Sequence, residues 1–182
     1  NSPYEEFSLL MEMRARARPG TIRTHKPLAI FVPARRLELW QTGRSQSKMD
    51  CKKAQYLDVE LDIFRQYILI YEWIKGVAST EAAAAEAAAA AGYADAAAFA
   101  QEMLERSVAD MEEAGFHVLD AKPQHAIVRP RRNGGFLNDR SGRPAYALVD
   151  FELLSRVPEY ERQARQERRQ AYLERQRDRF RH

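Results

Sequence analysis

Two short apolar segments in the second half of the chain each carry an aspartate at one end. Asp120 precedes the first segment in the sequence L-D-A-K-P, with Lys122 two residues later, and Asp150 follows the second in A-L-V-D-F-E. Carboxylates accept protons and bind hard divalent cations, and an ammonium group neutralises the charge of a phosphate. These side chains are therefore of the types that phosphate and metal chemistry uses.

A turn-rich connection separates the two aspartates. The range 129–144 contains N-G-G and S-G-R-P, which are typical turn sequences, and apolar residues that favour strands lie on both sides of it. We therefore predict a strand within 116–128, a polar hairpin, and a second strand within 147–152. This arrangement places Asp120 before the first strand and Asp150 at the end of the second.

Helix and strand patterns precede these two strands. Apolar residues recur at three- and four-residue spacing in Asp95–Ala114, which predicts a helix that starts at Asp95. Fourteen of the twenty residues in 81–100 are alanine, the best helix former, and we expect a helix that opens at Ser79. The remaining expectations are a helix over 1–18, strands over 27–32, 37–40, 54–61 and 66–74, a loop over 41–50, and a hairpin that pairs the last two strands.

The C-terminal range 159–182 is highly charged. It carries eight arginines against five acidic residues, with a thin apolar stripe. Pro158, followed by Glu159 and Glu161, is typical of a helix N-terminus. We expect a surface helix that is solvated or held by a protein partner. Nucleic-acid binding through its arginines is less favoured, because acidic residues are mixed among them.

The composition of the 182 residues narrows the class of protein. The formal net charge of +3 is compatible with an anionic partner. No run approaches the roughly 20 apolar residues that span a bilayer, so no membrane span is expected. A single cysteine, Cys51, excludes an internal disulfide and favours a reducing compartment, which predicts a cytoplasmic protein.

The order of these features resembles the protein-kinase-like superfamily from its hinge onward. The likeness covers roughly Tyr56–Glu152, about half of the chain, and consists of Y-E-W-I-K-G after a strand, a long helix, D-x-K-P before a strand, and D-F-E after the next. The resemblance implies an α+β, bilobal kinase-like fold. Its parts would be an N-terminal helix with a small β lobe over 1–71, short for a complete lobe, a hinge and reduced helical C-lobe over 72–158, and a long charged helix over 159–182.

The resemblance also implies a phosphotransferase that uses ATP and Mg²⁺. Asp120 would orient the acceptor hydroxyl and accept its proton, and Lys122 would neutralise charge on the transferred phosphoryl group. Asp150 would hold Mg²⁺ against the phosphates of the nucleotide. These roles require the three side chains to meet at one site.

Other positions complete or depart from the family pattern. The backbone of Glu72, Trp73 and Ile74 would hydrogen-bond the adenine. His125 occupies the position of a metal-binding asparagine, and imidazole is a poor ligand for Mg²⁺. No G-x-G-x-x-G, the motif of the loop that covers the phosphates, is present. No A-P-E is present either, so the sequence does not identify the phosphate acceptor. Two functions stay open: a kinase-like phosphotransferase in which His125 joins Asp150 as a metal ligand, and an inactive pseudokinase that binds nucleotide or acts as a scaffold.

Overall fold

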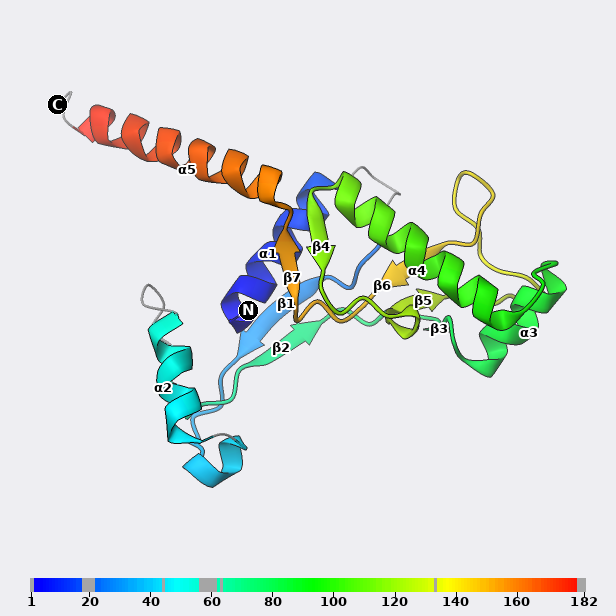
Figure 1. The fold of residues 1–182 in the computed structure, drawn as a ribbon, viewed down its shortest axis with the longest axis horizontal. Helices are drawn as coiled ribbons and strands as arrows, with labels where there is room; N and C mark the ends of the chain where they lie inside the picture. Colours follow the sequence, from blue (N-terminus) through cyan, green and yellow to red (C-terminus); the bar gives the residue numbers. More distant parts are fainter. Residues whose placement is uncertain are drawn as a thin grey trace.

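The computed structural model describes residues 2–17, 22–43, 45–55, 62, 64–132 and 134–179. This part of the chain is a mixed α+β structure with five α-helices and three small antiparallel sheets (Figure 1), which confirms the predicted α+β class. Within the described ranges, no helix has both the length and the apolar character that crossing a membrane requires.

The N-terminal helix α1 packs on a two-stranded antiparallel sheet, β1–β2. The bounds are Pro3–Arg16 for α1, Pro27–Phe31 for β1 and Ile68–Tyr71 for β2. Ser2 caps the helix, because its hydroxyl accepts a hydrogen bond from the backbone N–H of Glu5 and its own N–H donates to the Glu5 carboxylate. Leu10 and Met13 are fully buried. The predicted N-terminal helix and both predicted strands are confirmed, with slightly shorter bounds.

The strand predicted over 37–40 is wrong. Leu37 donates its N–H to the carbonyl of Phe64 at 2.6 Å, but the chain then forms a 3-10 turn, η1 (Leu39–Thr42). The backbone N–H of Glu38 is satisfied by the side chain of Gln41 at 2.9 Å. Local side-chain hydrogen bonds of this kind compete with pairing to a neighbouring strand.

The loop predicted over 41–50 is also wrong in its second half, where helix α2 (Gln46–Gln55) begins. The Gln46 amide donates to the Asp50 carboxylate one turn later at 3.1 Å, which supports the helix. Of the strand predicted over 54–61, the first two residues end α2, and 56–61 lie outside the described residues. Strand β2 pairs with β1, and the predicted hairpin partner of β2 falls mostly outside the described residues.

Three short strands form a second antiparallel sheet, and two helices contact it. The bounds are Val77–Ala78 for β3, Ala82–Ala90 for α3, Ala96–Glu113 for α4, Ala126–Val128 for β5 and Tyr146–Leu148 for β6, and the strand order is β3-β5-β6. Asp95 caps α4 as predicted, accepting the N–H of Ala98 at 2.7 Å. Ser79 does not cap α3; its hydroxyl donates to the carbonyl of Pro123 at 2.6 Å, and Glu81 occupies the cap position.

Two further strands, β4 and β7, form a separate antiparallel sheet. The bounds are Phe116–Val118 for β4, Pro123–His125 for the 3-10 turn η2, and Leu154–Arg156 for β7. β4 and β7 are antiparallel, with Val118 opposite Leu154. The predicted succession of strand, polar hairpin and strand is confirmed, because β5 and β6 are joined through 129–145. The pairing of β4 with β7 holds the segments on both sides of this hairpin together.

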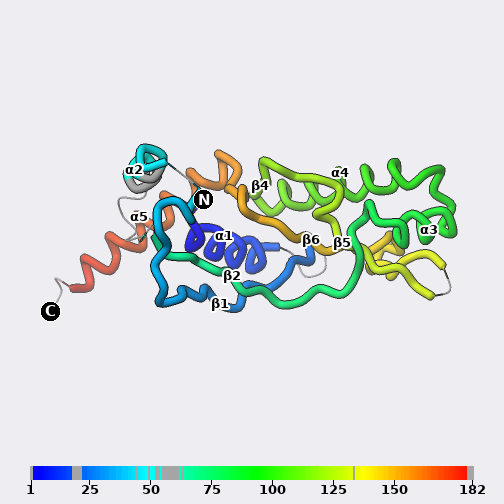
Figure 2. Tube along the Cα trace, turned by 90° about the horizontal axis from the view of Figure 1, so that it is seen from below, coloured from blue at the N-terminus to red at the C-terminus, as the bar shows by residue number. Residues whose placement is uncertain are grey.

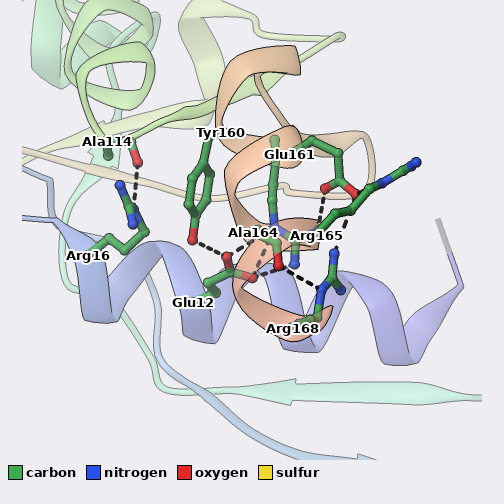
Figure 3. A network of polar contacts seen from close by, with 9 residues as sticks. Glu12, Arg16, Ala114, Tyr160, Glu161, Ala164, Arg165 and Arg168 are labelled. Carbon is green, nitrogen blue, oxygen red and sulfur yellow. Dashed lines mark hydrogen bonds and ion pairs between the residues drawn. The ribbon is translucent and has the colours of Figure 1, made fainter. Parts of the chain in front are cut away.

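The last helix, α5 (Pro158–Arg179), is attached by its first turns and then projects away from the rest of the molecule (Figures 1 and 2). Tyr160 and Ala164 are buried, whereas Tyr172 and Leu173 are exposed. Glu12 of α1 accepts hydrogen bonds from Arg156 and from the hydroxyl of Tyr160 (Figure 3). The predicted charged C-terminal helix is confirmed, and α1 holds its base.

Candidate functional site

Asp120 and Lys122 lie on the turn that follows β4. Oδ2 of Asp120 is 2.7 Å from Nζ of Lys122, and each side chain is about half exposed, 51% and 47%. The hydrogen bond to Asp120 is the main cause that raises the pKa of Lys122, and Asp150 contributes at longer range. Lys122 therefore stays a cation between two carboxylates.

Asp150 has an unusual backbone conformation. Its φ of +67° makes it the one non-glycine residue with positive φ in the described part of the chain. A left-handed backbone costs an L-residue roughly 1–2 kcal/mol, although aspartate and asparagine tolerate it better than most. The neighbouring Val149 N–H donates to the carbonyl of His125 at 3.0 Å, and Phe151 is 1% exposed. The conformation is thus held from both sides, as expected where structure over-determines a strained residue.

His125 connects the two loops. Its Nε2 lies 3.3 Å from Oδ2 of Asp150, and the imidazole side chain is 14% exposed. Its Nδ1 is buried and has no hydrogen-bond partner within the described residues. The side chains of His125 and Asp150 are within ion-pair distance, and they form a salt bridge when the imidazole is protonated.

These side chains meet at one small pocket. Lys122, His125 and Asp150 line it together with apolar and hydroxyl side chains from α4, β4 and β6. The full lining is Leu104, Ser107, Met111, Val118, Ala121, Lys122, His125, Leu148, Val149, Asp150 and Phe151. Asp120 is joined to this group through Lys122. Four residues that are up to 30 positions apart in the sequence are therefore neighbours.

The segment predicted to hold adenine is on the link between β2 and β3, and its three residues do not line this pocket. The backbone N–H of Glu72 donates to the carbonyl of Lys26 at 2.8 Å, which extends the β1–β2 pairing by one bond. The Trp73 side chain is 84% exposed, and Ile74 is half-buried. Contact of these three residues with a nucleotide stays a prediction.

His25 belongs to the neighbourhood of Asp150 and was missed by the sequence reasoning. Its ring stacks on Tyr71 with centroids 3.9 Å apart and meets Phe151 edge-on at 5.2 Å. The pKa of His25 is lowered to about 4, mainly by burial and also by the Arg14 guanidinium, and Asp150 opposes the shift. His25 immediately precedes an expected strand, but its position beside Tyr71 depends on which strands pair.

The donor set limits how a metal ion could be held. Among the residues that the structure describes, no three histidine, cysteine or acidic side chains gather in a metal-binding arrangement. Asp150 offers hard carboxylate oxygens, which suit Mg²⁺. His125 offers a nitrogen whose partner Nδ1 has no acceptor, whereas metal-bound histidines almost always donate their second N–H. Asp150 fits Mg²⁺, whereas His125 lacks the second hydrogen bond that a metal-bound histidine makes.

Comparison of the chain with protein-family models, with curated proteins and with solved structures produced no match.

Proposed function

We propose that the chain is a kinase-like, nucleotide-dependent phosphotransferase with an unidentified acceptor. The observation that carries this proposal is the meeting of Lys122, His125 and Asp150 at one pocket, with Asp120 bonded to Lys122. The order of elements from β2 to β7 supports a kinase-like arrangement of the two lobes, because strand pair, linker, helices, loop and strand hairpin follow one another as that fold requires. Phosphoryl transfer needs positioned charges more than covalent chemistry, and this group supplies them.

Each side chain has a role consistent with its environment. Asp120 is half exposed at the rim, where its carboxylate can orient an acceptor hydroxyl and receive its proton. Lys122 remains protonated and can move from Asp120 to an incoming phosphoryl group, because its side chain is long and partly exposed. Asp150 would hold Mg²⁺, which neutralises phosphate charge when bound. ATP is the expected phosphate donor, and Mg²⁺ would take its remaining ligands from phosphate oxygens and water.

A pseudokinase is the second candidate, and one observation favours it. The imidazole Nε2 of His125 lies 3.3 Å from Oδ2 of Asp150, so a basic side chain already faces one carboxylate oxygen. When the imidazole is protonated, a cation must compete with it for that oxygen, which weakens metal-dependent binding of a nucleotide. In this reading the pocket binds nucleotide weakly or serves as a scaffold, and helix α5, which projects from the molecule, contacts a protein partner (Figure 1).

Thermal unfolding with ATP, with and without Mg²⁺, tests nucleotide binding. A ligand at 100 times its Kd stabilises the folded state by about 2.7 kcal/mol, which is readily measured as a higher Tm. Asp150→Asn should remove the Mg²⁺-dependent part, and asparagine also tolerates the left-handed backbone. Glu152→Gln, an exposed acid two residues later, is the matched control. Absence of any ATP-dependent shift in the unmodified chain would refute the proposal.

Turnover separates the two candidates once binding is established. Incubation with ATP and candidate small-molecule or protein acceptors should release ADP at a rate that Asp120→Asn lowers by a factor of about 100 or more, because a positioned general base contributes 10²–10⁴-fold. The same variant should still show the Mg²⁺–ATP thermal shift. Binding without ADP release above background would assign the chain to the pseudokinase class.

A further inference from the structure

The hairpin that joins β5 to β6 is strongly basic and firmly anchored. Residues 129–145 include five arginines and a single acid, Asp139. Phe136, near the middle of the hairpin, is 4% exposed and stacks on Phe99 of α4 with centroids 4.6 Å apart and planes 8° from parallel. The Leu137 N–H donates to the Arg129 carbonyl and the Ala145 N–H to the Leu137 carbonyl, so each half of the segment is folded back on itself. The arginines are therefore displayed on a defined surface.

An open pocket of about 370 Å³ lies between this hairpin, α4 and the segment that precedes β1. Three arginines line it, Arg23, Arg106 and Arg140, against the single carboxylate of Asp139. The remaining lining residues are Leu137, Asn138, Ala145 and Tyr146. None of these residues lines the pocket that contains Asp150, so the two sites are separate.

Arg106 is the fixed cation of this pocket. Its side chain is 10% exposed, its two terminal nitrogens donate to the carbonyl of Pro144 at 2.7 Å and to Asp139 at 2.5 Å, and its guanidinium lies 5.0 Å from the ring centre of Tyr146. Its Nε is buried with no partner in the described structure. A buried N–H without an acceptor costs about 1–3 kcal/mol, so a pocket-lining residue retains an unmet need for an acceptor.

The other two arginines are held less tightly. Arg23 and Arg140 also line the pocket, and both are exposed. Their long side chains can close over a ligand, and guanidinium forks match the oxygens of a phosphate better than ammonium groups do. A ligand in the pocket can therefore receive charge-assisted hydrogen bonds from a largely buried cation and from two exposed ones.

The charge balance selects the class of ligand. Three guanidinium groups against one carboxylate leave a net charge of about +2 at the lining, which complements a phosphate monoester, whose charge near pH 7 is about −1.5 to −2. Asp110 and Arg143 are near the pocket-lining residues and carry opposite charges that offset each other. Asp110 accepts a hydrogen bond from the hydroxyl of Tyr146, and Arg143 donates one to the hydroxyl of Ser141. A ligand with a single carboxylate would neutralise half of this net positive charge, and a cationic ligand would be repelled.

We propose that the pocket formed by Arg23, Arg106 and Arg140 binds a phosphate monoester. The site is distinct from the proposed phosphotransfer site and does not depend on nucleotide. The phosphate could belong to a free metabolite or to a phosphorylated serine of a peptide, and both present the same group to the arginines.

Calorimetric titration with O-phosphoserine, without nucleotide or metal, tests the proposal. We expect saturable binding that is stronger than binding of serine or acetate. The double variant Arg23→Gln/Arg140→Gln should weaken it about tenfold or more, since it removes two guanidinium groups that can make charge-assisted hydrogen bonds to the phosphate. Arg162→Gln/Arg169→Gln, which removes two exposed charges from α5, should leave the affinity within about twofold.

Further measurements keep the two sites and the two ligand sources apart. In a ¹H–¹⁵N spectrum, the Nε–H signal of Arg106 should move on addition of O-phosphoserine, and Asp150→Asn should bind it as the unmodified chain does. A phosphoserine peptide that binds over tenfold tighter than the free amino acid would assign the site to a phosphorylated partner, and equal affinities would assign it to a small phosphate ester. No saturable binding, or equal weakening by both double variants, would overturn the proposal.

Discussion

The imidazole of His125 and the carboxylate of Asp150 face each other, with Nε2 and Oδ2 3.3 Å apart. The two residues are separated by 25 positions, and the bond from the Val149 N–H to the His125 carbonyl keeps their loops in register. The contact makes His125 a partner of Asp150 before any cation is present. The identity of the residue at position 125 therefore affects how Asp150 binds a metal ion.

His125→Asn should increase the response of the site to Mg²⁺. The amide oxygen of asparagine is a harder ligand than imidazole nitrogen, and the replacement also removes the imidazole that faces Oδ2 of Asp150. The measurement is the Mg²⁺ concentration that gives half of the ATP-dependent rise in Tm, which should fall in the variant. A parallel titration with Mn²⁺, which accepts nitrogen more readily, should change less. An unchanged or higher Mg²⁺ requirement would contradict the role assigned to His125.

The protonation of His25 should make the protein less stable in mild acid. Its pKa is about 4 in the folded state against a reference value of 6.5, so the unfolded chain binds more protons between these values. The unfolding free energy should therefore fall as pH is lowered from about 6.5 to about 4. Because the ring is partly exposed, we expect a total loss of about 1–2 kcal/mol, less than the full shift implies.

Urea unfolding at several pH values measures this effect, and His25→Phe removes the titrating group while keeping a ring to stack on Tyr71. The variant should lose part of the pH dependence between 6.5 and 4 and keep the part due to carboxylates. His117→Phe is a control for the loss of a histidine elsewhere. If His25→Phe and the unmodified chain have the same slope over this window, the folded pKa is not depressed.

Arg156 should be the residue that contributes most to the attachment of α5. It bonds Glu12 of α1 at 2.5 Å and Glu161 of α5 at 2.7 Å, and its side chain is 16% exposed. Arg156→Gln leaves these carboxylates without their shared cation and should lower the unfolding free energy by about 1–3 kcal/mol. Arg165→Gln breaks an exposed pair with Glu161 and should cost less than about 0.5 kcal/mol. Comparable losses in the two variants would show that the interhelical contact has no special role.

Gly76 should resist substitution because two atoms of β5 occupy the space of a side chain. A Cβ there would lie 2.5 Å from the carbonyl oxygen of Val128 and 2.6 Å from Cγ2 of Ile127. Gly76→Ala must displace backbone at the β3–β5 pairing, and overpacking of this kind costs about 1–3 kcal/mol in addition to backbone strain. Gly142→Ala has positive φ and no such contact, so it reports the strain alone. Urea unfolding should find Gly76→Ala the less stable of the two.

Local elements were predictable where local rules decide. The helix over 95–114 follows from apolar spacing and from the Asp95 cap, both of which act within a few residues. The polar hairpin between β5 and β6 follows from its glycines and prolines. The segment 37–50 misled the prediction, because the backbone of Glu38 and the side chain of Gln46 found partners nearby. A short apolar run does not by itself indicate whether another strand is available to pair with it.

The sequence by itself determined which chemical groups are available and which helices and turns carry them: Asp120, Lys122 and Asp150 stand at the ends of short apolar segments whatever the packing. Only the tertiary structure decided that β1 pairs with β2 and β4 with β7, that His25 lies against Tyr71, and that His125 faces Asp150. Propensity and turn chemistry act over a few residues. Pairing between distant strands depends on how many side chains bury their apolar surface together, and that sum is set by the whole fold.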